Sequence, residues 1–170
     1  MIQIEKLSKK NLKQASELAD KIFYYEEIKP SESFESSLNE KKFEELSKKT
    51  GIPLTELKYW VAKDQNTKKI VGTTGLYIDK RDKKEAVWLG WYCVDEKYRG
   101  KGIGQKLLKH IIKKTKRRRN IFLRLYTSTR PSEITAKIIY DKFGFKIMKE
   151  KEVKKDGGYD TYYMQLNVHL

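Results

Sequence analysis

The chain has 170 residues, of which 38% are hydrophobic and 36% charged, and its formal net charge is +15. This length is typical of one domain, so we expect a single domain over residues 1–170. The sequence contains no run of 18 apolar residues, which excludes a membrane-spanning helix. A single cysteine, Cys93, and an N-terminus without a secretory pattern predict a cytoplasmic location.

The charge is distributed unevenly along the chain. Residues 26–45 contain seven acidic and three basic residues, a net charge of −4, so the remainder carries +19. The densest basic run, at residues 113–119, follows the last apolar residue of a helical pattern. Because the helix dipole favours cations at its C-terminus, a solvated helix end explains this run better than a nucleic-acid patch, which remains the alternative.

Hydrophobic periodicity and turn residues predict eleven elements in the order β-α-α-β-β-β-α-β-α-β-β, a mixed α/β domain. In chain order they are a strand at 2–7, a helix capped by Ser8, a second helix from Ser31 or Ser33 to Gly51, strands at 59–62, 69–78 and 85–94, a helix at 101–116, a strand at 121–126, a helix at 132–144, and strands at 145–149 and 159–168.

A basic turn with three glycines, within residues 93–104, joins an apolar strand to an amphipathic helix. Such a turn lets several backbone N–H groups converge, and the N-terminus of the helix adds its own unpaired N–H groups, so the arrangement suits a pyrophosphate. It is not a Walker A loop, and Gln105 stands where the dinucleotide-binding fingerprint needs glycine. The sequence therefore predicts a phosphorylated cofactor held mainly by backbone.

The motif Arg99-x-x-Gly102-x-Gly104 after an apolar strand resembles the signature of the GNAT superfamily of acyl-CoA-dependent N-acetyltransferases. A second motif of that family, a short helix reading Ala-x-x-x-Tyr that closes on Gly-Phe, is matched at residues 136–145. Two motifs in the right order are more specific than either alone. The resemblance runs from about Lys69 to the end, and the earlier part agrees only in its order of elements.

The resemblance implies one GNAT-like domain, with a central mixed, mostly antiparallel sheet that has helices on both faces. The fourth and fifth strands would separate, and the pantetheine arm of acetyl-CoA would enter the gap. Acetyl-CoA, released as coenzyme A, is thus the implied substrate, and Tyr140 the implied general acid. The implied cofactor-binding residues are Tyr92, Cys93, Val94, Arg99, Gly100, Lys101, Gly102, Ile103 and Gly104.

The general base is not given by the resemblance. Many relatives carry a glutamate on the strand before the turn, and by register Trp88 stands there in this chain. The remaining candidates are Glu26, Glu27 and Glu133, of which Glu27 is our hypothesis, and water could also relay the proton. Position 133 is a further departure, since relatives often carry asparagine there.

The acceptor is expected to be a primary amine that attacks acetyl-CoA directly in a ternary complex. In the family the first two helices border the acceptor cleft, and in this chain they carry the net −4 of residues 26–45. This charge favours a cationic acceptor, such as a polyamine, a lysine side chain, a peptide N-terminus or an aminoglycoside.

Two other functions remain open. The chain could be a basic nucleic-acid- or ribosome-associated binding module, or an acyl-CoA-sensing domain without catalysis, which the missing strand glutamate favours. We expect no metal and no membrane partner, and a homodimer could form through an exposed edge strand near residues 159–168.

Overall fold

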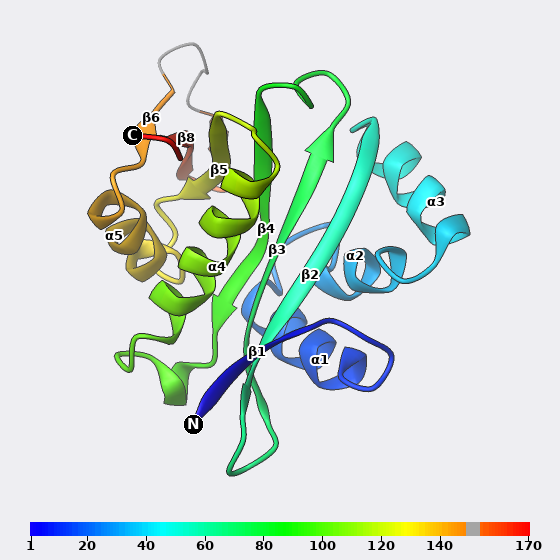
Figure 1. Cartoon of the computed structure of the whole chain (residues 1–170), viewed down its shortest axis with the longest axis vertical. Coiled ribbons are helices and arrows are strands. Elements are labelled where there is room, and N and C mark those ends of the chain that lie inside the picture. The colour runs from blue at the N-terminus through cyan, green and yellow to red at the C-terminus, as the bar shows by residue number, and fades with distance from the viewer. Residues whose placement is uncertain (149–153) are drawn as a thin grey trace.

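The computed structural model describes residues 1–148 and 154–170, with side-chain surroundings for 1–148 and 157–170. Figure 1 shows one twisted sheet with helices on both faces, α1 to α3 on one side and α4 and α5 on the other. The elements are β1 (Ile2–Lys6), α1 (Leu12–Ile22), α2 (Pro30–Ser36), α3 (Glu40–Thr50), β2 (Leu54–Asp64), β3 (Ile70–Asp79), β4 (Ala86–Val94), the 3-10 turn η1 (Glu96–Tyr98), α4 (Ile103–Arg117), β5 (Phe122–Ser128), α5 (Ile134–Lys142), β6 (Lys146–Ile147), β7 (Lys154–Asp156) and β8 (Tyr159–Asn167).

The strands are ordered β1-β2-β3-β4-β5-β8-β6, and β7 also pairs with β8. Every neighbouring pair is antiparallel except β4 with β5, which are parallel. A parallel pair requires a crossover connection, and α4 provides it. The predicted mixed, mostly antiparallel sheet with helices on both faces is confirmed.

The strands β4 and β5 pair over only three positions and then separate. The last pair is Trp88 with Arg124, so the ends of both strands beyond it are not bonded to each other. A bulge in β4 accompanies the separation: Trp91 has a φ of +36°, and its carbonyl accepts a hydrogen bond of 2.7 Å from the hydroxyl of the buried Thr73 on β3. Bulges bend the strand that carries them, so this one turns the end of β4.

Two hydrophobic cores hold the helices on the sheet. Under α4 and α5 the core contains the fully buried Leu107, Leu108 and Ile111. Under α1 to α3 the core contains Phe34, whose ring centroid lies 4.8 Å from that of Tyr59. The sheet is therefore covered on both faces. A separate finding is that the described part of the chain contains no candidate membrane-spanning helix.

The expected second helix is two helices. Asn39 accepts a hydrogen bond of 3.0 Å from the N–H of Lys42 and so caps α3, while the hydroxyl of Ser36, at the end of α2, donates to the carbonyls of Glu32 in α2 and Lys42 in α3. Serine and asparagine compete with the helical backbone in this way, and that competition divides the segment. The predicted end is right, since Gly51 follows α3 with a left-handed φ of +66°.

Three other expectations need correction. Ser8 does not cap α1: its carbonyl accepts from Asn11 and Leu12 in a preceding turn, and the helix begins at Leu12. The strand expected at 59–62 extends over the whole of β2 because β1 and β3 pair along it. No exposed edge is formed by β8, which pairs with β5 on one side and with β6 and β7 on the other. Of the strand expected at 145–149, Lys149 lies outside the described residues.

Gly75 is required by the close packing of β2 on β3. A Cβ atom there would lie 2.1 Å from the ring of Tyr59 and 2.8 Å from the carbonyl of Lys58. We expect Gly75→Ala to lower the free energy of unfolding by about 3 kcal/mol. Gly51→Ala, where φ is positive but nothing lies within 4 Å, should lose only about 1 kcal/mol. Chemical denaturation measures both, and equal losses would contradict this account of the packing.

Candidate active site between β4 and β5

A cavity of about 630 Å³ occupies the region where β4 and β5 separate. It is bordered by the loop between α1 and α2, the C-terminal end of α3, the turn before α4, and α5. All the site residues expected from the sequence line this cavity except Lys101, whose ammonium lies 5.0 Å from the ring centroid of Tyr98. Those that line it are Glu27, Tyr92, Cys93, Val94, Arg99, Gly100, Gly102, Ile103, Gly104 and Tyr140.

The glycine-containing turn brings the N-terminus of α4 to one end of the cavity. Gly100 and Gly102 have φ values of +75° and +76°, in the left-handed region that favours glycine. Gly102 is the N-cap and supplies no side-chain cap, and the first turn of α4 contains no acidic residue. The first N–H groups of α4, which have no partner within the helix, and the positive end of its dipole are thus available to an anion.

Gly104 allows the side chain of Tyr92 to lie against α4. A Cβ atom at position 104 would be only 2.6 Å from the Tyr92 hydroxyl. That hydroxyl is buried and has no hydrogen-bond partner among the described residues. Since a buried polar group is normally bonded, Tyr92 is a donor available to a ligand in the cavity.

Tyr140 lies beside Tyr92, with 5.6 Å between the two ring centroids. It is 5% exposed, and burial is the main cause that raises the pKa of its hydroxyl well above the usual range. The hydroxyl is therefore protonated at neutral pH and able to donate. Cys93 differs in that it is a buried thiol whose pKa burial raises to about 11, so it is not a thiolate at neutral pH.

A hydrogen-bonded carboxylate ties the loop after α1 to β5. Glu133 accepts hydrogen bonds from the Tyr25 hydroxyl at 2.8 Å, the Thr127 hydroxyl at 3.1 Å and the N–H of Ser128 at 2.5 Å. Above the Tyr25 ring, at 4.4 Å from its centroid, lies the guanidinium of Arg130. Tyr25 and Glu133 are 108 positions apart, and no sequence pattern pointed to their pairing.

Only two of the seven acidic residues in segment 26–45 line the cavity, Glu26 and Glu27. Glu32 is paired with Lys49 on α3 at 2.5 Å, and Glu35 with a lysine of the same helix. With Glu133, three carboxylates therefore lie at the end of the cavity formed by the α1–α2 loop and α5.

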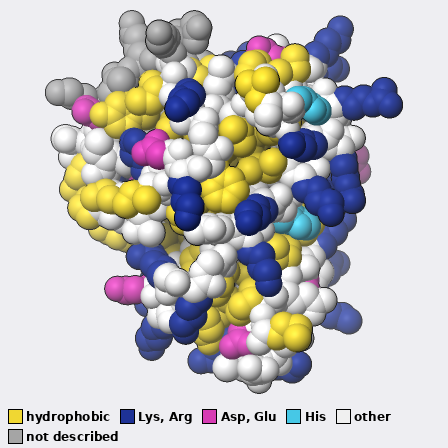
Figure 2. Space-filling model, turned by 60° about the vertical axis from the view of Figure 1, so that its left-hand side comes forward, with side chains coloured by type: hydrophobic (Ala, Val, Ile, Leu, Met, Phe, Trp, Pro, Cys, Tyr) yellow, Lys and Arg dark blue, Asp and Glu magenta, His cyan; other side chains and the backbone are white. Residues whose placement is uncertain are grey.

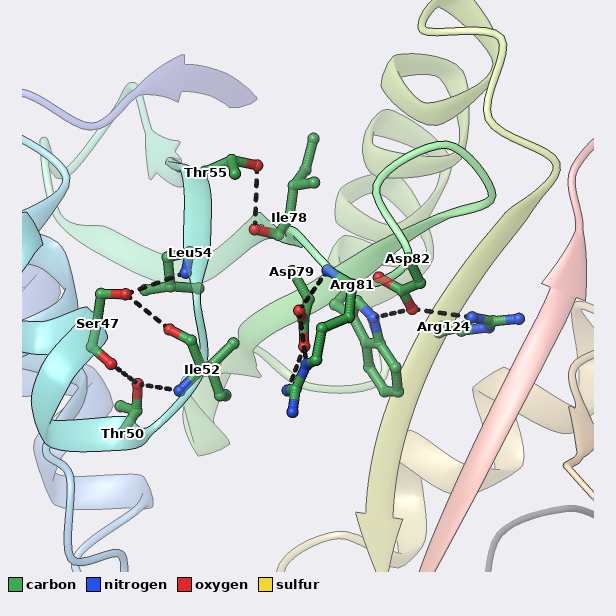
Figure 3. A network of polar contacts seen from close by, with 11 residues as sticks. Ser47, Thr50, Ile52, Leu54, Thr55, Ile78, Asp79, Arg81, Asp82 and Arg124 are labelled. Atoms are coloured by element: carbon green, nitrogen blue, oxygen red, sulfur yellow. Dashed lines mark hydrogen bonds and ion pairs between the residues drawn. The ribbon is translucent and has the colours of Figure 1, made fainter.

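Trp88, at the strand position where the resemblance implied a glutamate, does not line the cavity. Its indole N–H donates to Asp82 at 2.9 Å, and the same carboxylate oxygen accepts from Arg124 at 2.8 Å (Figure 3). Arg124 in turn pairs with Glu85 at 3.1 Å. This network joins the β3–β4 hairpin to β5 at the point where the strands separate. Among the residues that the structure describes, no group of three potential ligands could hold a metal ion.

Residues 55–147, more than half of the chain, match the family model described as "Acetyltransferase (GNAT) domain". A curated relative is the spermine/spermidine N(1)-acetyltransferase of Bacillus subtilis, 36% identical over 72 residues. The match covers 42% of this chain and 47% of that protein, so the chain spans about half the length of this relative.

Solved structures share the fold over nearly the whole chain. A GNAT-family structure from Desulfovibrio desulfuricans superposes with a TM-score of 0.74 at 12% identity, covering 99% of both chains. One from Elizabethkingia anophelis, with acetyl-CoA bound, gives a TM-score of 0.62 at 20% identity, covering 98% of this chain and 97% of that one. By the family match and its shared fold, the chain belongs to the GNAT family of acetyltransferases.

Proposed function

We propose that this protein transfers an acetyl group from acetyl-CoA to a primary amine of a cationic small molecule, in a ternary complex. The observation that carries the proposal is one cavity with two unlike ends. At one end are the free N–H groups of α4, at the other three carboxylates, and two buried tyrosines lie along its wall. These ends suit a pyrophosphate and an ammonium ion.

Acetyl-CoA binding would rest mainly on backbone. The pyrophosphate would bind at the turn from Arg99 to Gly104, and the pantetheine amides at the open edge of β4 around residues 92–94. A backbone N–H near Val94 would donate to the thioester carbonyl, and that bond would strengthen as negative charge develops on the oxygen. Arg99 contributes to the shape of the turn, since its Nε donates to the Val94 carbonyl at 3.2 Å.

In the reaction the acceptor nitrogen attacks the thioester carbon, a C–N bond forms, and the C–S bond breaks. Tyr140 would donate a hydrogen bond or its proton to the departing sulfur. Glu27, which is exposed at the cavity, would take the proton of the amine through water. Glu133 is less suited to be the base because three donors already occupy its oxygens.

A polyamine is our first choice of acceptor. The carboxylates of Glu26, Glu27 and Glu133 would attract its several ammonium groups, and the likeness to the spermine/spermidine N(1)-acetyltransferase of Bacillus subtilis supports the same class of acceptor. The direct test is release of free thiol from acetyl-CoA with spermidine, an aminoglycoside and a basic peptide as acceptors. Turnover with spermidine above the other two supports the proposal. Acetyl-CoA binding without turnover on any amine would instead favour an acyl-CoA-sensing domain.

The two tyrosines can be separated by single substitutions. We expect Tyr140→Phe to lower kcat by about 100-fold, because it removes the proposed donor to the leaving sulfur. Tyr92→Phe is the matched control, since it removes a neighbouring buried hydroxyl with the same loss of one oxygen atom. Steady-state kinetics at saturating acetyl-CoA measures both, and equal effects on kcat would contradict the specific role of Tyr140.

The acceptor site can be tested by charge reversal. We expect the double variant E26K/E27K to raise KM for spermidine roughly tenfold at low salt, and the difference to shrink as salt screens it. The control E44K/E45K changes the net charge equally at exposed positions of α3 that do not line the cavity. An unchanged KM in E26K/E27K, or the same rise in both variants, would contradict the proposed acceptor site.

A further inference from the structure

The solvent-facing side of α4 is a second charged feature, and the proposed reaction does not use it. Residues 101–119 contain nine Lys and Arg and no Asp or Glu. Figure 2 shows Lys and Arg side chains gathered over one side of the face that it presents, where acidic side chains are sparse. We name as the α4 basic face the exposed side chains Lys106, Lys109, Lys113, Lys116 and Arg117.

The α4 basic face lies opposite the buried side of the helix. Its members follow one another at intervals of three or four residues, apart from the adjacent Lys116 and Arg117, so they share one stripe. Leu107, Leu108 and Ile111 are fully buried in the core and fix the direction in which the stripe points. The 15 residues of α4 span about 22 Å, a length along which one strand of a nucleic-acid duplex carries about six phosphates.

Within the part of the chain that the structure describes, these cations are not neutralised. Among the described residues, no carboxylate lies within ion-pair distance of any member of the α4 basic face. The ammonium of Lys106 donates to the Ile2 carbonyl at 3.1 Å, which leaves its charge uncompensated. The neighbouring Arg118, which is not a member of the α4 basic face, forms an ion pair with Glu56.

The basic surface continues beyond the helix onto the β3–β4 hairpin. A second cavity, of about 560 Å³, is lined by Lys83 and Lys84 of the hairpin, by Arg118 and Asn120 after α4, and by Glu56 of β2, which pairs with Arg118. The Asn120 side chain donates to the Lys83 carbonyl at 3.0 Å and so holds the hairpin against the end of α4. The hairpin lysines are exposed and add charge at the end of the stripe.

The character of the surface favours one ligand. The exposed large aromatic side chains of the described chain, Tyr24 and Tyr126, lie outside α4 and the hairpin, so the surface has no platform on which unpaired bases could stack. Among the exposed large apolar residues, Ile121 is the nearest in sequence to the α4 basic face. A single apolar side chain would bury too little apolar surface to anchor this face in a bilayer. The α4 basic face therefore presents a row of positive charges, which suits the regularly spaced phosphates of a nucleic-acid duplex.

We propose that the α4 basic face and the β3–β4 hairpin bind the phosphate backbone of double-stranded nucleic acid. The proposed acetyl-CoA site takes the N-terminus of α4, whereas this surface runs along the outer side of the helix toward its C-terminus and the hairpin. The acidic end of the active-site cavity is formed by the α1–α2 loop and the N-terminal end of α5, and α1 and α2 lie on the other face of the sheet from α4 (Figure 1), so a duplex bound along α4 and the hairpin would leave the acceptor entrance open. The contacts would be independent of base sequence, since they reach only the backbone.

The test compares two triple variants with the same change of net charge. K113E/K116E/R117E alters the α4 basic face, and K9E/K10E/K13E alters exposed lysines at the start of α1, on the other side of the sheet. Fluorescence anisotropy with a labelled duplex of about 20 base pairs, as RNA and as DNA, gives Kd across a range of salt. Thermal unfolding with acetyl-CoA reports separately on the fold and on the active site.

We expect the wild type to bind either duplex with a log–log salt slope of about −4, as contact with four to five phosphates would give. K113E/K116E/R117E should weaken binding at least roughly tenfold and lower the magnitude of the slope, whereas K9E/K10E/K13E should change Kd less than about twofold. Equal weakening in both variants, no duplex binding at low salt, or tighter binding to phosphatidylserine vesicles than to duplex would overturn the proposal. Acetyl-CoA binding should be the same in all three proteins, so this outcome is independent of the proposed reaction.

Discussion

The separation of β4 from β5 after the Trp88–Arg124 pair is the constraint on which the site depends. In an otherwise continuous sheet, the facing edges of β4 and β5 are thereby unpaired with each other, while β4 stays paired with β3 and β5 with β8, and a chain-like ligand can bond to backbone in the gap. The bulge at Trp91, held by the buried Thr73 hydroxyl, bends β4 at this point. Arg124, the β5 residue of this last pair, also donates to Asp82 of the β3–β4 hairpin. This bond helps to hold β4 and β5 together up to the point where they separate.

The same constraint positions the anion-binding end of the cavity. Because β4 and β5 are parallel, the chain must cross over between them, and the crossover helix α4 begins next to the end of β4. Burial of Leu107, Leu108 and Ile111 fixes that helix on the sheet, with each side chain contributing up to about 2 kcal/mol. At the opposite end, the bond between Tyr25 and Glu133 connects the α1–α2 loop to α5, so the acidic end of the cavity is built from segments far apart in sequence.

Local sequence predicted the elements that carry most of this arrangement. The apolar run of β4, the glycines of the turn and the period of α4 are each local signals, and the helix did begin at the glycine motif. The division between α2 and α3, the bulge at Trp91 and the double-sided pairing of β8 were missed, because each depends on hydrogen bonds to neighbours that the local pattern does not reveal. In the site, the pairing of Glu133 with Tyr25 and the unpartnered Tyr92 hydroxyl required tertiary structure. The role of each site residue stays a prediction.

In our proposal the gap between β4 and β5 and the turn before α4 form an acetyl-CoA site that depends on geometry rather than on net charge. The decisive measurement is thermal unfolding of the wild type and of Gly104→Val, each with acetyl-CoA and with ATP as a second polyanion. A valine side chain would occupy the space of the Tyr92 hydroxyl and obstruct the cavity beside the turn. We predict that acetyl-CoA at about 100 times its Kd stabilises the wild type by roughly 2.7 kcal/mol, that ATP does much less, and that the folded variant loses the difference. Equal stabilisation by the two ligands in the wild type would contradict the claim, because it would mean that the positive charge of the chain attracts any polyanion.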